Sequence, residues 1–393
     1  MTKRTKREYF QAIVRRYHQS CKKRKSEILN EFCIVCGHNR SYAIRLLNRG
    51  YKRNKKRPGR ASKYQEPEFL KILTILWKGT GWVCGRLLKR AIPTWIPMYE
   101  AVYGEISEEL KTKLLTISAS TIDRILRHAR AKAGRGKSLT KPGSILREEI
   151  PISGSVWDET RPGFVEADTV AHCGSSGQGP FVLSVTLTDL ATQWTESRAI
   201  WTKKAERVVE ALIDIEDNMP FPFRGFDCDN GSEFLNDHLV RYFQRKRIPL
   251  TRSRPYRKND NAHVEQKNWM HARQLFGYAR FENPDLVPVM NDIYKRLWSP
   301  YKNFFIPGMK LKEKIRVGSK IVKKYDTPMT PYERVMASPD ISDERKEQLT
   351  EKFKSLNPFL LKAEIDKYQS VINRLAKVSF DEWQMINTAN AKH

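Results

Sequence analysis

Three acidic residues constrain the fold of this chain more than any other feature, because each lies where a regular element ends or begins. Asp168 ends an apolar, strand-like run that starts at Phe164, and Asp229 ends a second one, directly before an Asn-Gly turn signal. Glu265 lies just inside a predicted helix. In the numbering, 60 residues lie between the two aspartates and 35 between Asp229 and Glu265. We therefore expect two strand ends and one helix to bring three carboxylates together.

The net charge indicates what kind of molecule such carboxylates act on. The chain carries a net charge of +28 and its pI is near 9.8. The charge is uneven, because residues 1–62 hold 19 Lys/Arg against 3 Asp/Glu, a net +16. Such a chain attracts polyanions, and a nucleic acid fits better than a membrane surface. No stretch approaches 18 consecutive apolar residues, so no transmembrane helix is expected.

Carboxylate ligands favour hard cations, so we expect two Mg²⁺ ions at the three acids, with Mn²⁺ as the alternative. Two such ions about 3.5–4 Å apart can activate an attacking oxygen and stabilise a leaving one across a phosphodiester. We expect Asp168 to bridge both ions, Asp229 to hold one and Glu265 to hold the other. The phosphate is then expected to be that of a nucleic acid.

Other acids compete for these roles. Glu233 is the nearest substitute for Glu265. We expect Glu166 and Asp227 to point to the opposite face of the sheet from Asp168 and Asp229, and therefore to stay outside the metal site.

The strand pattern predicts the fold of the acidic region, residues 163–283. Phe164–Thr169, Pro180–Asp189 and Thr195–Trp201 read as three antiparallel strands, and alternating helices and strands follow as far as 278. This order favours a mixed α/β sheet with helices on both faces. Residues 134–162, rich in Gly, Ser, Pro and charge, are predicted to be a linker.

The N-terminal third is predicted to be helical. Residues 1–60 read as a basic helix-turn-helix domain in which Arg40 and Arg45 face DNA, although an ordinary helical hairpin stays open. Arg57 and Arg60, in the tether after its helices, either lie in a minor groove or belong to a plain charged linker. Residues 61–133 are predicted to form a second helix-turn-helix-like domain. Residues 284–393 are predicted to be a basic, mainly helical region.

The six cysteines are scattered apart from one Cys33-x-x-Cys36 pair, which fits a reducing cytoplasm, with the protein associated with the nucleoid. His18 and Cys21 precede this pair at a spacing that also allows a zinc site. Burial of Cys33 and Cys36 on an apolar helix face is the alternative, and the sequence leaves the two open.

The motifs around the acids resemble a known family. The run Phe164–Thr169 contains Asp168, Asp229 opens Asp-Asn-Gly-Ser-Glu-Phe, and Ser253-x-Pro-Tyr leads to Asn261-x-x-x-Glu265. Over about residues 160–280 these motifs resemble the retroviral-integrase-like catalytic core of DDE transposases from bacterial insertion sequences. The spacing of 35 residues between the last two acids is the one this family uses.

The resemblance implies a ribonuclease-H-like mixed five-stranded sheet, with Asp168, Asp229 and Glu265 as the catalytic acids. It also implies cleavage of double-stranded DNA at element ends and strand transfer into target DNA. We expect a homo-oligomer, because two ends must be held together. We expect further phosphate contacts from Arg257, Lys258 and Arg273. A DNA-binding regulator with an inactive core, or a Mg²⁺ nuclease of the same fold, stays open.

Overall fold

The computed structural model describes residues 1–51, 63–132, 160–228, 237–252, 269–317 and 320–390. These residues form two compact units, Met1–Lys63 and Tyr64–His393. Each unit has its own cluster of buried apolar side chains. The division of the chain into five parts that the sequence suggests stays a prediction.

The first unit is a bundle of three helices, α1 (Lys3–Gln19), α2 (Lys22–Cys36) and α3 (Arg40–Arg49). Gly37 ends α2 at φ 61°, a left-handed conformation that glycine adopts at no steric cost. Asn39 then caps α3, because its side chain accepts a hydrogen bond from the Tyr42 backbone N–H at 2.8 Å. The prediction that this part of the chain is helical is confirmed.

The second unit begins with four helices that pack against the C-terminal part of the chain. They are α4 (Pro67–Gly79), α5 (Gly85–Tyr103), α6 (Glu108–Thr116) and α7 (Ala119–Lys132). The buried Trp95 indole donates to the Phe305 carbonyl at 3.1 Å, and the Tyr301 hydroxyl donates to the Gly79 carbonyl. These bonds join elements more than 200 residues apart in sequence into one hydrophobic core.

The sheet has the strand order β3-β2-β1-β4-β5. Its strands are β1 (Phe164–Ala171), β2 (Val182–Asp189), β3 (Thr195–Trp201), β4 (Gly225–Cys228) and β5 (Leu250–Arg252). The first three are antiparallel neighbours, whereas β4 runs parallel to both β1 and β5. The expected fold class, a mixed five-stranded sheet flanked by helices, is confirmed.

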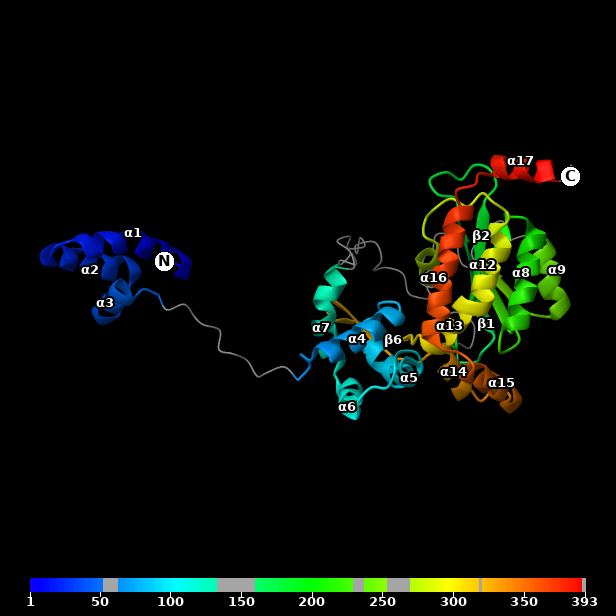
Figure 1. The fold of residues 1–393 in the computed structure, drawn as a ribbon, viewed down its shortest axis with the longest axis horizontal. Coiled ribbons are helices and arrows are strands. Elements are labelled where there is room, and N and C mark those ends of the chain that lie inside the picture. Colours follow the sequence, from blue (N-terminus) through cyan, green and yellow to red (C-terminus); the bar gives the residue numbers. More distant parts are fainter. Residues whose placement is uncertain (52–62, 133–159, 229–236, 253–268, 318–319, 391–393) are drawn as a thin grey trace. The chain divides into compact units, whose positions relative to one another are not determined.

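One face of the sheet is mainly apolar at the central strands β1 and β4. Val165 and Ala167 of β1 and Phe226 of β4 are fully buried on it. The helices α8 (Ala205–Asn218) and α9 (Asp237–Lys246) cover this face, as Figure 1 shows in green. Phe226 and Phe243 of α9 lie with ring centroids 4.5 Å apart. Hydrophobic burial therefore fixes the strand register on this side.

One long helical stretch lies against the other face and its β3 edge. It consists of α12 (Leu286–Asp292), the π-helical turn η2 (Ile293–Trp298) and α13 (Ser299–Phe305). Pro300 has no N–H for the helical hydrogen bond, and the wider π-helical turn directly before it accommodates that loss. A shorter π-helical turn, η1 (Trp269–Arg273), and α11 (Gln274–Phe276) precede this stretch.

The C-terminal region is mainly helical, as expected, but it also contains a hairpin of two strands, β6 (Leu311–Val317) and β7 (Lys320–Tyr325). The helices are α14 (Pro331–Ala337), α15 (Asp343–Lys354), α16 (Pro358–Leu375) and α17 (Phe380–Asn390). The hairpin was not anticipated, because its apolar residues are few and separated by lysines.

Candidate functional site

The second face of the sheet carries polar side chains. Cross-strand partners point to the same face, so the register places Asp168, Thr186 and Ser197 side by side on β1, β2 and β3. Thr186 and Ser197 are buried with their hydroxyl oxygens 3.2 Å apart. A buried face of this kind requires each polar group to find a partner. The side chains of this face therefore offer oxygen atoms, whereas those of an apolar face offer only carbon.

Asp168 is half-buried on this polar face. Its Oδ1 accepts a hydrogen bond from the Thr169 backbone N–H at 2.7 Å, which fixes the orientation of the carboxylate. Ala167, the residue before it, is paired with Cys228, the last residue of β4. The chain therefore leaves β4 next to Asp168.

Glu166 and Asp227 do not point to the face opposite Asp168, so that expectation is wrong. Side chains two residues apart on a strand share a face, and Glu166 and Asp168 are two apart. Glu166 is also the register partner of Asp227, so all three carboxylates belong to the polar face. Glu166 is buried, and Asp227 accepts a hydrogen bond from the Thr251 hydroxyl at 2.6 Å.

His172 continues the polar face beyond the end of β1. Its ring is fully buried, stacks on Phe281 and has Nε2 2.8 Å from the hydroxyl of Ser184. Tyr294 of η2 donates to that hydroxyl at 2.9 Å. Burial, helped by the nearby Arg273 guanidinium, lowers the pKa of His172 to about 3, so the ring is neutral at pH 7. This histidine is therefore part of the core.

Arg273 belongs to η1, the turn that follows the predicted Glu265 helix. Its guanidinium donates to the Ala171 carbonyl at the end of β1 at 2.9 Å and lies over the ring of Tyr278. The side chain thus ties η1 to the strand that carries Asp168. Its predicted role in phosphate binding stays a prediction.

Two other predicted DNA contacts lie on α3 of the first unit, and both are exposed. Arg40 donates to Asn30 and Ser26 of α2, so part of its charge serves the packing of two helices. Arg45 lies over the ring of Tyr42, with the guanidinium carbon 5.0 Å from the ring centroid. Their contact with DNA stays a prediction.

The remaining predicted site residues lie outside the described residues. They are Asp229, Glu265, the alternative Glu233, and the basic residues Arg57, Arg60, Arg257 and Lys258. The predicted linker lies almost entirely outside them as well. Within the ranges that the structure describes, no three His, Cys, Asp or Glu side chains are grouped so that they could hold a metal ion.

The N-terminal Cys and His residues are distributed between core and surface. Cys36 is buried, Cys33 is half-buried and Cys21 is exposed. The Nε2 of His18 lies 2.9 Å from the Leu47 carbonyl oxygen. Burial raises the pKa of the Cys36 thiol and so disfavours the thiolate that binds zinc.

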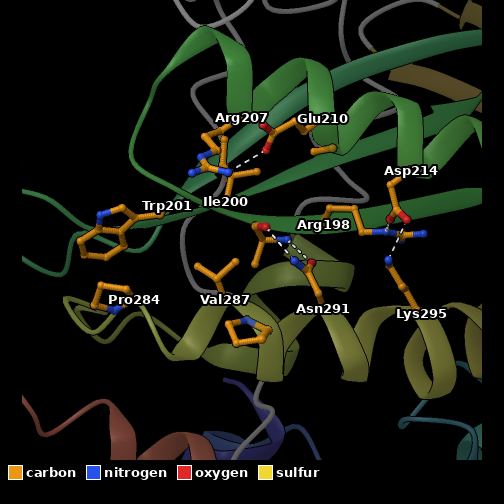
Figure 2. Close-up of a pocket in the computed structure, with 13 residues that line it drawn as sticks. Arg198, Ile200, Trp201, Arg207, Glu210, Asp214, Pro284, Val287, Asn291 and Lys295 are labelled. Atoms are coloured by element: carbon orange, nitrogen blue, oxygen red, sulfur yellow. Dashed lines mark hydrogen bonds and ion pairs between the residues drawn. The ribbon is translucent and has the colours of Figure 1, made fainter. Parts of the chain in front are cut away.

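A groove of about 450 Å³ lies along the β3 edge of the sheet, between α8 and α12, as Figure 2 shows. Burial alone would raise the pKa of Asp214, but hydrogen bonds from Lys295 and Arg198 lower it. The carboxylate therefore stays ionised and joins α8 to η2. Because β2 lies between β3 and β1, this groove is separate from the part of the sheet that carries Asp168.

No family model matches the chain. The uncharacterized protein y4rM of Sinorhizobium fredii (strain NBRC 101917 / NGR234) is 39% identical over 340 residues, which cover 84% of this chain and 95% of y4rM. Among the residues that the structure describes, no helix has the length and apolarity needed to cross a membrane.

Two solved structures are similar at lower identity. The HTLV-2 integrase catalytic core domain in complex with magnesium (trimeric form) is 13% identical over 29% of this chain and 70% of its own, with a TM-score of 0.24. The simian T-cell lymphotropic virus intasome in complex with PP2A regulatory subunit B56 gamma is 15% identical over 46% of this chain, with a TM-score of 0.29; this chain spans 60% of that one. The fold described above rests on the strand order itself.

Proposed function

The chain belongs to the family of the Sinorhizobium fredii protein y4rM, and we propose that it is a DDE transposase or integrase-like enzyme that cleaves and joins DNA. The observation that carries this proposal is the position of Asp168. Its carboxylate lies on the polar face, one residue beyond the Ala167–Cys228 pair at which β4 ends. Asp229 is the next residue after Cys228.

The acids of this face fit magnesium. Carboxylate oxygens are the donors that Mg²⁺ prefers, and Asp168 is the one proposed ligand that lies in the described part of the face. In the proposal Asp168, Asp229 and Glu265 hold two ions. Ions held by these three acids would supply activation of the attacking oxygen and neutralisation of charge on the leaving one.

The chain's own groups orient the reaction. The Thr169 N–H holds the Asp168 carboxylate in one orientation. The buried hydroxyls of Thr186 and Ser197 support the face beside it without adding charge. Arg273 anchors η1 to the end of β1, and thereby positions the segment that follows Glu265. In the proposed reaction, water first hydrolyses the phosphodiester at the element end and frees a 3′-hydroxyl. This 3′-hydroxyl then attacks a phosphodiester of the target DNA in line and displaces the target strand's own 3′-hydroxyl.

The test is incubation of the purified full chain with Mg²⁺ and duplex DNA carrying its own element's ends. We expect cleaved and joined products from the wild type, and a loss of at least about 100-fold in Asp168→Asn, because one metal ligand is gone. Asp229→Asn and Glu265→Gln should give the same loss with DNA binding retained.

Asp227→Asn and Glu233→Gln are the matched controls. Full activity in Asp229→Asn together with loss in Asp227→Asn would show that Asp227, and not Asp229, is the second acid. Cleavage without joining would identify a nuclease, and bound but intact DNA would identify a regulator.

A further inference from the structure

The β6–β7 hairpin concentrates positive charge on a narrow ribbon. Between Lys310 and Tyr325 the chain has seven Lys/Arg and one acidic residue, Glu313, a net charge of +6. Glu313 is already paired, because the Lys324 ammonium lies 2.9 Å from its Oε2. The positive charge of the ribbon is therefore not balanced within the ribbon.

The ribbon is exposed on both faces. Lys312, Arg316 and Lys323 are exposed, and so are two of its larger apolar side chains, Val322 (44% exposed) and Tyr325 (41%). In the described part of the chain, β6 and β7 pair only with each other. A lone two-stranded hairpin in water is marginally stable. This one gains little from packing, so its sequence calls for an explanation other than core formation.

The backbone register of the hairpin also groups positive charge on one of its faces. By the same register, Arg316 and Tyr325 share the face of Lys323. One face thus combines cations with an exposed aromatic ring, the composition typical of a nucleic-acid surface. A polyanion along this face would neutralise the exposed cations Arg316 and Lys323.

The base of the ribbon is held firmly. Asp326, directly after β7, accepts a hydrogen bond from the Lys310 backbone N–H at 2.7 Å, and its own N–H donates to the Lys310 carbonyl. Its other carboxylate oxygen pairs with the largely buried Arg334 of α14 at 2.8 Å. The Lys310 ammonium reaches the Ala191 carbonyl in the β2–β3 turn. The root of the ribbon is therefore fixed to the rest of the second unit.

We propose that the β6–β7 ribbon is a DNA-binding element that lies against duplex DNA. Two paired strands are about 4.8 Å apart and seven residues span about 23 Å, dimensions that a B-DNA major groove about 12 Å wide admits. Lys312, Arg316 and Lys323 contact phosphates. The identification of DNA as the ligand rests on the proposed function.

The test compares two triple variants of the full chain. Lys312→Gln/Arg316→Gln/Lys323→Gln removes three charges from the ribbon and keeps the aliphatic stems. Lys352→Gln/Lys367→Gln/Lys377→Gln removes three exposed charges from the C-terminal helical region. Affinity for a 30-base-pair duplex is measured by fluorescence anisotropy at several salt concentrations, with thermal unfolding as a check of folding.

We expect the ribbon variant to bind at least about tenfold more weakly. Its slope of log K against log salt should fall by about 2–3, close to one for each phosphate that the ribbon no longer neutralises. The control should keep the wild-type slope. Lys312→Arg/Lys323→Arg, which preserves charge, should keep the affinity. Equal weakening in the ribbon and control variants would overturn the proposal, as would an unchanged ribbon variant.

Cleavage assays separate this proposal from the proposed function. A chain that binds duplex through the ribbon but gives no Mg²⁺-dependent products retains the ribbon proposal and loses the enzymatic one. Magnesium-dependent cleavage with wild-type duplex affinity in the ribbon variant retains the enzymatic proposal and rejects the ribbon. Loss of binding to an acidic protein partner, with duplex affinity unchanged, also rejects the ribbon proposal.

Discussion

At the scale of single residues, His172 couples the stability of the sheet to pH. Its folded pKa of about 3 lies below the ordinary value of about 6.5, because burial disfavours the imidazolium. Between these two values only the unfolded chain binds the proton. The stability that His172 contributes is therefore fully present above about pH 6.5 and is lost as the pH falls toward 3, by about 1.4 kcal/mol per pH unit.

We expect His172→Phe to remove this dependence. A phenyl ring can keep the stacking on Phe281, and Ser184 keeps its hydrogen bond from Tyr294. The variant should unfold at pH 7 within about 1.5 kcal/mol of the wild type. Urea unfolding at pH 7.0, 5.5 and 4.5 measures the effect. The free energy of unfolding of the variant should rise relative to that of the wild type at each lower pH.

Asp189 also titrates in this pH range, so the free energy of unfolding of His172→Phe has to be compared with that of the wild type at each pH. Burial raises its pKa to about 6, above the ordinary value, although hydrogen bonds from Thr192 and Gly163 oppose the shift. Its contribution to stability therefore runs the other way: it is full below about pH 4 and is lost as the pH rises through 6. The two proteins share Asp189, so it cancels. A pH-independent difference would contradict a neutral His172.

At the scale of elements, two asparagines close the free edge of β3. The Asn303 amide accepts from the Thr195 N–H at 3.0 Å and donates to the Thr195 carbonyl at 2.9 Å, as a neighbouring strand would. Asn291 does the same for Ala199. Exposed strand edges promote aggregation, and these side chains satisfy the edge without adding a strand.

We expect Asn303→Leu to destabilise the protein by about 2–4 kcal/mol, because it leaves a buried N–H and a buried C=O without partners. Asn373→Leu, on the exposed face of α16, is the control and should change stability by less than about 0.5 kcal/mol. Chemical denaturation measures both free energies of unfolding. Equal effects in the two variants would show that the edge does not need the amide.

The sequence predicted the elements of the sheet well, because strong β-forming runs are bounded by clear turns. The expected strand Thr195–Trp201 matches β3 residue for residue. The alternation of side chains also places Glu166 on the face of Asp168, since residues two apart on a strand point the same way. The sequence did not indicate the hydrogen bonds from Asn303 and Asn291 to β3, because these bonds depend on how a helix distant in sequence packs on that strand.

The hairpin was also beyond the sequence patterns. Its strands, Leu-Lys-Glu-Lys-Ile-Arg-Val and Lys-Ile-Val-Lys-Lys-Tyr, do not alternate apolar and polar residues, so the period of two that indicates a strand is missing. The π-helical turn η2 was not predicted for a related reason: its cause is local, because Pro300 disturbs a helical pattern that is otherwise continuous. At the candidate site, the structure shows the polar side chains around Asp168, which the sequence did not predict. The assignment of Asp229 and Glu265 to the site comes from the sequence alone.

At the scale of the whole molecule, the two compact units are expected to unfold separately. Their buried apolar clusters share no residue in the described part of the chain. The smaller cluster is built around Phe32, which is fully buried between its three helices. Separate cores in one chain allow two transitions in place of one.

Phe32→Ala should unfold the first unit alone. Truncating a buried phenylalanine costs about 3–5 kcal/mol, a large share of the stability of a unit of 63 residues. Trp95→Ala, in the core of the second unit, is the matched variant and should lower only the other transition. Differential scanning calorimetry resolves the two. On the proposal that the basic first unit recognises element ends, Phe32→Ala should also lose preference for these ends while it keeps Mg²⁺-dependent cleavage. A single transition that moves in both variants would mean that the units fold as one.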